Sequence, residues 1–306
     1  MKIEVFEYNS FCSDTFLGNP AGVCMDVGLS KKEKQNIAYK NGFSETAFLL
    51  EEDSCFKISF FTPTSEIDLC GHATVASAAH LSNKMGIKKI TFKANHDVLY
   101  CDVDNEFVSL ILPDQNIEKK EPNEVIKAIL GTSCIDYYES KIHFIGVLDS
   151  FDSLMKWDND FFSHDNLSKD QLILTSTSEN SNYDYALRMF GTKNLGVRED
   201  PVTGSAQPPI FSYWSKMLKK ENVLVYQSSE RGGLMRVKRD LRGIDVNGRV
   251  KLVKHFKDNI DTHIFINKPA NCDFYTQEYL DFINKFKNQV IPETYPYCFF
   301  IDGGAL

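Results

Sequence analysis

Two short stretches of the chain carry residue types that suit chemistry on a small acid. Residues 68–74 read Asp-Leu-Cys-Gly-His-Ala-Thr, and residues 200–206 read Asp-Pro-Val-Thr-Gly-Ser-Ala. In each, a carboxylate stands a few residues before a glycine that opens an expected helix. The free N–H groups of a helix's first turn attract anions, and glycine lets a ligand approach the backbone. Two such sites facing each other would hold a carboxylate on the amides of Gly71, His72, Gly204 and Ser205.

Glu45 is the main candidate for the reacting group. It lies in residues 43–50, Phe-Ser-Glu-Thr-Ala-Phe-Leu-Leu, which predict a strand. Its neighbours Phe43, Ala47 and Phe48 are apolar, and burial beside them would raise the pKa of the carboxyl group toward neutrality. Such a pKa suits a group that exchanges protons with carbon near pH 7. A solvated glutamate at the start of a strand is the ordinary alternative.

The elements that would position these residues form two units of similar size. Residues 30–40 predict a helix with Ser30 as N-cap and Glu33 closing a capping box. Residues 72–81 predict a slim helix of small residues that strands can surround closely. Strands of the first unit are expected near residues 3–5, 23–25, 43–50, 56–62, 89–93, 98–103 and 107–112. After a linker at 113–122, the second unit predicts helices at 121–130, 151–155 and 211–218 and strands at 143–148, 172–175, 183–190, 223–227, 235–239 and 250–254.

Composition and charge exclude several classes of function. The chain has 306 residues, 42% of them hydrophobic and 25% charged, with a net charge of −8. The basic residues are scattered among acidic ones, so we expect no nucleic-acid partner and no binding to an anionic membrane. No apolar run approaches the roughly 18 residues that span a bilayer. The first eight residues alternate like a strand and do not resemble a signal peptide, which predicts a cytoplasmic protein.

The cysteines indicate neither a disulfide framework nor a zinc motif. There are eight, and no two form a C-x-x-C pair. No cluster of cysteine and histidine has the sequence spacing of a zinc site. They are typical of reduced, mostly buried thiols in the cytosol.

Four segments in order resemble the PhzF-like family of phenazine biosynthesis isomerases, within the diaminopimelate epimerase-like fold. They are residues 18–23, 43–48, 68–74 and 199–206, followed by Tyr213-Trp214. The resemblance covers about residues 1–256. It implies an α+β fold of two pseudo-repeated domains, each a barrel-like mixed or antiparallel sheet around a central helix, with the active site in the cleft between them. It also implies a homodimer that uses no metal and no organic cofactor.

On this resemblance the first domain covers residues 1–116, joined by a returning strand near 247–256, and the second covers 117–246. Residues 257–306 form a C-terminal extension. Within it, Tyr279, Ile283, Phe286 and Val290 predict an amphipathic helix, and residues 298–301 predict a strand. The sequence assigns this extension no role.

The resemblance also implies roles for individual residues. Glu45 carries over as the general acid/base, and His72 and Asp200 line the catalytic site from its two sides. Asn19, Gly71, Gly204 and Ser205 would bind the substrate. Ordinary alternatives remain: His72 held by local contacts, Asp200 as an N-cap carboxylate, and Asn19 as a turn residue.

One departure lies just after the second stretch. Relatives usually continue with histidine, whereas this chain has Gln207-Pro208-Pro209. Proline is tolerated in the first turn of a helix, where the N–H groups lack intrahelical partners, so the anion site can survive while the pocket wall changes shape.

Three hypotheses of function follow. The first is a cofactor-independent isomerase that moves a proton between carbons of a small carboxylate-bearing metabolite, with Glu45 as general acid/base. The second is a weakly active or inactive protein that binds a small acid or a partner on the same fold. The third is an amino-acid racemase or epimerase that uses Cys70, although Val202 stands where a second thiol would be needed. The sequence does not name the substrate.

Overall fold

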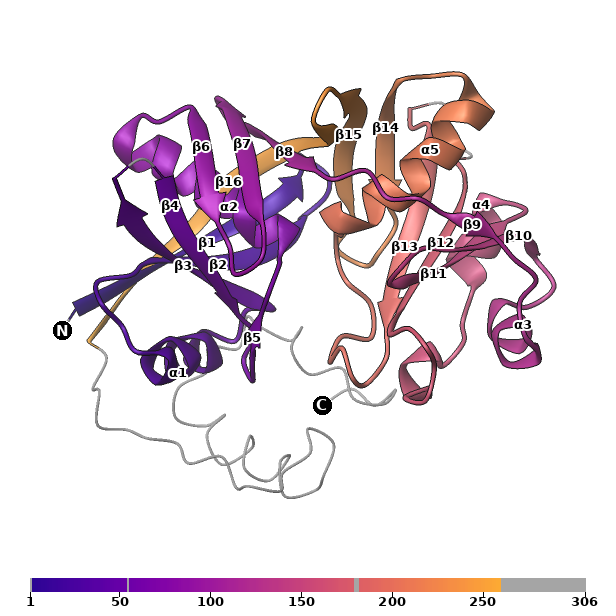
Figure 1. Ribbon diagram of the computed structural model, residues 1–306, viewed down its shortest axis with the longest axis horizontal. Helices are drawn as coiled ribbons and strands as arrows, with labels where there is room; N and C mark the ends of the chain where they lie inside the picture. Colours follow the sequence, from indigo (N-terminus) through magenta and orange to yellow (C-terminus); the bar gives the residue numbers. More distant parts are fainter. Residues whose placement is uncertain (1, 54, 179–181, 260–306) are drawn as a thin grey trace.

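The computed structural model describes residues 2–53, 55–178 and 182–259, which fold into two halves lying side by side (Figure 1). The elements of the first half are β1 (Lys2–Cys12), β2 (Asn19–Met25), α1 (Lys31–Asn41), β3 (Glu45–Glu52), β4 (Cys55–Phe61), β5 (Glu66–Ile67), α2 (Gly71–Met85), β6 (Lys89–Lys93), β7 (Val98–Asp104) and β8 (Phe107–Leu112). Those of the second half are β9 (Glu118–Lys119), α3 (Glu124–Leu130), β10 (Cys134–Glu139), β11 (His143–Leu148), α4 (Phe151–Lys156), the 3₁₀ turn η1 (Phe161–Ser163), β12 (Gln171–Thr177), β13 (Tyr185–Gly191), the 3₁₀ turn η2 (Gly204–Ala206), α5 (Gln207–Leu218), β14 (Asn222–Gln227) and β15 (Gly233–Asp240). The long strand β16 (Gly243–Asn259) belongs to both.

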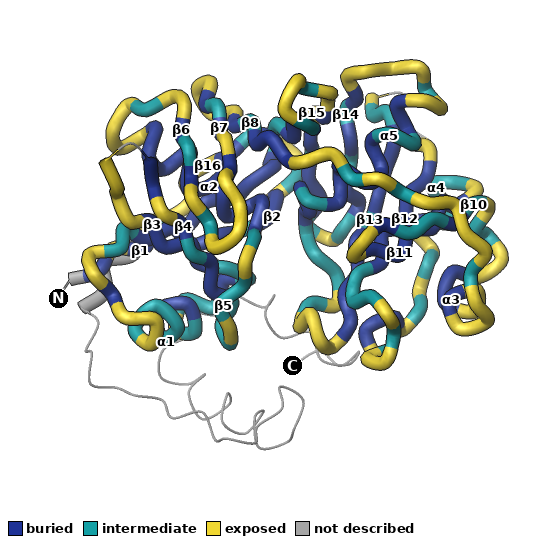
Figure 2. The backbone as a smooth tube through the Cα atoms, viewed as in Figure 1, coloured by how far each residue is buried: buried dark blue, intermediate teal, exposed yellow. Residues whose placement is uncertain are grey.

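The strands of the first half close around α2. Their order is β1-β2-β3-β4-β6-β7-β8-β16, and β16 pairs back onto β1, which completes the ring. The ring is mixed, because β2 runs parallel to β3 and β4 runs parallel to β6. Residues 71–82 of α2 are all buried, which its alanines, serines and glycine make possible. Figure 2 shows the surrounding strands mostly as buried and the connecting loops as exposed. The predicted central helix is confirmed.

The second half continues the same sheet as β16-β15-β14-β13-β12-β11-β10-β9. Helix α5 packs its apolar residues Ile210, Phe211 and Trp214 into the core cluster that also contains the inner face of these strands. Helices α3 and α4 pack into a separate cluster with residues such as Ile126 and Leu154. The α+β architecture predicted from the sequence is therefore present in both halves. No helix in the described part of the chain is long and apolar enough to cross a membrane.

The two halves join through β16. Its residues 243–247 pair with β15 on one side, residues 244–249 pair with β8 on the other, and the rest of the strand pairs with β1. Phe11, which has a φ of 60°, packs into the joint. A methyl group added at Gly248 would lie 2.5 Å from the Phe11 ring, so this crossing needs glycine. The boundaries after residues 116 and 246 stay predictions.

Most elements lie where the sequence predicts them. The capping box of α1 is present, since the Ser30 hydroxyl accepts from the Glu33 amide and the Glu33 carboxylate accepts from the Ser30 amide. Helix α5 begins at Gln207, earlier than predicted, with both prolines in its first turn. Strand β10 was not predicted. The helix and strand predicted at 279–290 and 298–301 lie outside the described residues.

Candidate active site

Strand pairing brings Asn19 and Glu45 to the same end of the first barrel. Strands β2 and β3 run parallel with Ala21 opposite Glu45, and β3 begins at Glu45. Side chains alternate along a strand, so Glu45 shares the face of Ala47, which lies in the core cluster around α2. Phe48 lies on the other face, in a cluster with Phe43. Glu45 therefore points toward the start of α2 and away from those two aromatic rings.

His72 is the centre of the site. Its Nε2 lies 3.0 Å from Glu45 Oε2 and 3.3 Å from the Ser44 hydroxyl. Its Nδ1 lies 3.1 Å from Asn19 Nδ2 and 3.4 Å from Cys70 Sγ. The His72 and Glu45 side chains are only 7% and 13% exposed, so these contacts are shielded from water. The ion pair is therefore strengthened by its surroundings.

The pKa of Glu45 shifts in the direction opposite to the prediction. Burial raises the pKa of this carboxyl group, as the sequence indicated, but the charge of His72 and hydrogen bonds with His72 and Ser44 outweigh it. The pKa is held below its usual value. His72 lies in a separate segment of the sequence. A prediction from the apolar neighbours of Glu45 alone therefore gave the shift of its pKa the wrong sign. Burial lowers the pKa of His72, but proximity to Cys70 and Glu45 raises it well above its usual value. The pair is therefore a carboxylate and an imidazolium.

Asp200 reaches the site from the second half. Its Oδ1 accepts a hydrogen bond of 2.8 Å from Asn19 Nδ2, and its Oδ2 accepts one from the Thr203 hydroxyl. Burial raises the pKa of Asp200 to about 6, although the charge of His72 and these hydrogen bonds act in the opposite direction. Asp200 caps neither η2 nor α5, whose N-caps are Thr203 and Ala206, so the N-cap alternative is wrong.

The two glycine stretches meet at this point. A methyl group added at Gly71 would lie 3.8 Å from the backbone nitrogen of Ser205 and 3.9 Å from Gly204 Cα. Cys70, the N-cap of α2, makes no side-chain hydrogen bond to the first turn. The predicted face-to-face arrangement is thus present, with the two stretches nearly in contact. Substrate binding by Gly71, Gly204 and Ser205 stays a prediction.

Asn19 lies between the two halves, and its side chain is fully buried. Substrate binding by Asn19 stays a prediction. Its Nδ2 donates to Asp200 Oδ1 and, at 2.9 Å, to the Val202 carbonyl, while His72 Nδ1, a donor in the imidazolium, is a neighbour at 3.1 Å without a hydrogen bond. The Asn19 amide therefore links the two halves next to His72 and Asp200.

Cys70 and Val202 do not form a pair of thiols. Burial and the charge of Glu45 raise the pKa of the Cys70 thiol to about 11, so the thiol is neutral near pH 7. Val202 is fully buried and contributes its carbonyl oxygen, which accepts from Asn19. A racemase with two opposed thiols therefore lacks one of its groups.

Three potential metal ligands lie together. The ligand atoms of Glu45, Cys70 and His72 fall within 4.8 Å of one another, the one such group among the described residues. The sequence did not reveal it, because Glu45 is far from the other two along the chain.

Several residues of the site escaped the sequence reasoning. Gln227 donates to the Asp200 carbonyl at 2.8 Å and accepts from the Thr203 amide at 2.7 Å, so it fixes the loop that carries Asp200. Ser44 contacts His72. Ser44 and Thr203 lie within the segments 43–48 and 199–206 and could have been suspected from them. Gln207 is buried and accepts from the Tyr185 hydroxyl at 2.8 Å.

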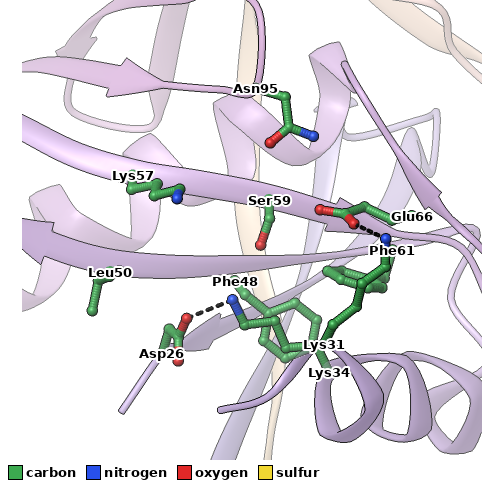
Figure 3. A pocket seen from close by; sticks show the side chains of 10 residues that line it. All are labelled: Asp26, Lys31, Lys34, Phe48, Leu50, Lys57, Ser59, Phe61, Glu66 and Asn95. Carbon is green, nitrogen blue, oxygen red and sulfur yellow. Dashed lines mark ion pairs between the residues drawn. The ribbon is translucent and has the colours of Figure 1, made fainter. Parts of the chain in front are cut away.

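A cavity on the outer side of the first half is separate from this site. It has a volume of about 160 Å³ and is lined by residues of β3, β4 and α1, including Phe48, Lys34 and Lys57 (Figure 3). Lys34 pairs with Asp26 and Lys31 pairs with Glu66 across it. Its wall uses the face of β3 opposite to Glu45, so it gives no access to Glu45 and His72.

Comparison with known proteins identifies what the chain resembles. The sequence profile of a family described as phenazine biosynthesis-like protein matches residues 8–254. A protein of Halalkalibacterium halodurans, named an uncharacterized isomerase, is 33% identical over 245 residues, which cover 78% of this chain and 91% of the relative. The human phenazine biosynthesis-like domain-containing protein is 32% identical over 282 residues, covering 83% and 98%.

Solved structures agree with the fold. A phenazine biosynthesis PhzC/PhzF protein from Clostridium difficile superposes with a TM-score of 0.78 at 30% identity, covering 84% of this chain and all of that chain. A proline racemase of Agrobacterium radiobacter superposes with a TM-score of 0.58 at 10% identity, covering 86% and 94%. The racemase shares the fold alone. Together they establish the diaminopimelate epimerase-like fold for this chain.

Proposed function

The chain belongs to the phenazine biosynthesis-like family of isomerases, and we propose that it moves a proton between carbons of a small carboxylate-bearing metabolite. Glu45 is the general acid/base in this proposal. Because the family's members include proteins named isomerases, an enzyme is favoured over a protein that only binds. The prolines at the start of α5 do not argue otherwise, since the helix forms with them in its first turn.

One observation carries the proposal. Glu45 and Asp200 come from opposite halves, Glu45 pairs with His72, Asp200 accepts from Asn19 beside that histidine, and the pKa values of the two carboxyl groups are shifted in opposite directions. Buried carboxyl groups whose pKa values are shifted by charged neighbours are concentrated at functional sites. Glu45 is ionised and ready to accept a proton, while Asp200 holds its proton up to about pH 6.

The steps follow from these states. The carboxylate of Glu45 takes a proton from one carbon of the substrate and returns it to another, so the net change is an isomerisation. A carboxylate with a low pKa is a weak base, so substrate that separates Glu45 from His72 would raise its basicity. The freed imidazolium then stabilises the negative charge that develops on the substrate. The amides of the two glycine stretches hold the substrate carboxylate, and Asp200 orients its remaining polar groups.

The test is exchange of deuterium from solvent into small carboxylic acids, aromatic amino acids among them, followed by proton NMR. Glu45→Gln should abolish the exchange and leave binding nearly intact. Glu51→Gln, on the exposed part of the same strand, is the matched control and should exchange like wild type. Exchange that persists in Glu45→Gln would disprove the role of Glu45. In a crystal soaked with the acid, its carboxylate should contact amides of a glycine stretch with Glu45 about 3 Å from the exchanging carbon or its proton.

Two further expectations belong to this proposal. A homodimer is testable by light scattering on the purified chain. A cytoplasmic location is testable by fractionation of cells that express it.

A further inference from the structure

Cys70 has no part in the proton transfer proposed above, yet it lies against the reacting pair. Its Sγ is 3.4 Å from His72 Nδ1 and 3.8 Å from His72 Nε2. Both residues sit at the start of α2, and Glu45 approaches from β3. A thiol, an imidazole and a carboxylate therefore converge from two elements that the barrel holds rigidly together.

The spacing of these atoms fits a tetrahedral metal. Zinc binds sulfur at about 2.3 Å and nitrogen or oxygen at about 2.0–2.2 Å, so neighbouring ligands of one ion stand roughly 3.3–3.6 Å apart. The observed separations are 3.0 Å from Glu45 Oε2 to His72 Nε2 and 3.8 Å from that nitrogen to Cys70 Sγ. These two separations are within a few tenths of an ångström of that range, and all three ligand atoms lie within 4.8 Å of one another, so small side-chain rotations would bring them onto one ion.

A second observation points the same way. Glu45 Oε2 is shielded from water, and its contact with His72 Nε2 at 3.0 Å is a poorly aligned ion-pair contact. A buried carboxylate oxygen whose lone pairs are incompletely used is a good ligand for a cation.

We infer that Glu45, Cys70 and His72 form a binding site for a divalent cation of the zinc class, and that the bound cation blocks proton transfer by Glu45. The three side chains supply a thiolate, a neutral imidazole nitrogen and a carboxylate oxygen, and water takes the fourth position. Binding releases the thiol proton and the imidazolium proton to solvent. The blocking effect rests on the proposed function, whereas binding itself does not.

Zinc chloride titrated into the purified full chain by calorimetry tests the binding. We expect about one ion per chain. Cys70→Ser should weaken the affinity for zinc by at least about tenfold. Mutation of a residue that only supports a metal ligand already costs that much, so loss of a ligand should cost at least as much. Cobalt(II) should give the near-ultraviolet absorption of a metal–thiolate bond in wild type and lose it in Cys70→Ser.

Matched controls separate this site from incidental binding. Cys134→Ser removes a half-buried thiol of the second half, and His96→Asn removes an exposed histidine 3.7 Å from Asp68. Both should bind zinc like wild type. Thermal unfolding followed by circular dichroism checks that each variant is folded, and Glu45→Gln provides a second ligand variant. The inference is overturned if wild type binds no zinc, or if folded Cys70→Ser and Glu45→Gln bind it like wild type.

The two proposals fail separately. Zinc that binds through Cys70 should stop deuterium exchange in wild type, and a chelator should restore it. Exchange that continues at saturating zinc would refute the blocking effect. Glu45-dependent exchange in a protein that does not bind zinc would leave the proposed function standing and remove only the present inference.

Discussion

The two glycine stretches share a backbone plan but surround it with different chemistry. In the first half, α2 is enclosed by a closed ring of strands, and its start carries a thiol and a charged histidine. In the second, a 3₁₀ turn leads into α5, which has two prolines in its first turn, and the nearby groups are a valine and a carboxyl group with a raised pKa. The comparison teaches that a duplicated architecture does not imply duplicated roles. In the proposed mechanism the first half supplies the base, and the second supplies a carboxyl group that orients the substrate.

The largest effect is expected from the base itself. Glu45→Gln should lower deuterium exchange by about 10²–10⁴-fold, the contribution of a positioned acid or base. The variant keeps the shape of the side chain, so affinity for the acid, measured by calorimetry, should change little. If Asp200→Asn caused the larger loss instead, the assignment of roles to the two halves would have to be reversed.

Asp200 should reveal itself in the pH dependence of stability. The pKa of Asp200 is raised from 3.8 to about 6 on folding, so the folded state binds this proton more tightly than the unfolded state does. The resulting contribution to the free energy of unfolding is fully present below about pH 4 and is lost as the pH rises through about 6. The loss is about 3 kcal/mol. The free energy of unfolding of wild type relative to Asp200→Asn, measured with urea, should therefore fall by that order between these pH values.

Asp26 offers the matched control for that titration. Its side chain is 6% exposed but lies closer to the surface than Asp200, and Lys34 and the amides of Leu29 and Gly28 outweigh the effect of burial and lower its pKa. The stability of wild type relative to Asp26→Asn should therefore rise with pH, through the range below its normal pKa. The same sign for both aspartates would contradict the shift assigned to Asp200.

A smaller effect should distinguish the packing of the two glycines. A methyl group at Gly71 meets nothing closer than 3.7 Å, whereas one at Gly204 lies 3.3 Å from the Phe11 ring. Gly71→Ala should be neutral or stabilise by up to about 1 kcal/mol, because alanine favours the helix. Gly204→Ala should destabilise by about 1–2 kcal/mol through overpacking. Equal urea midpoints would show that the two stretches are packed alike.

The smallest effect is expected from the thiol. Cys70→Ala, assayed with a chelator present, should lower deuterium exchange by less than about tenfold, well short of the loss expected for a true acid or base. Racemisation of an amino acid by wild type that disappears in Cys70→Ala would instead revive the racemase hypothesis.

Local signals in the sequence predicted the elements well. The capping box at Ser30 and Glu33 and the small residues of α2 act over a few positions, and both are present. The glycine stretches were rightly expected to meet.

The properties that failed depend on contacts between distant segments. The pKa of Glu45 had the wrong sign because His72 lies beside it in space only. Gln227 supports the Asp200 loop from another strand, and no motif marks it.

Strand β16 has a consequence for how the molecule unfolds. Because its first residues form ladders with β15 and β8 at once, neither half can release its edge without breaking bonds of the other. Heat or denaturant should therefore melt both halves in one cooperative transition, despite their separate appearance in Figure 1. Deleting one residue between 244 and 247 would turn the side chains that follow to the opposite face of the sheet. Such a deletion should lower the free energy of unfolding of both halves together, not of one half alone.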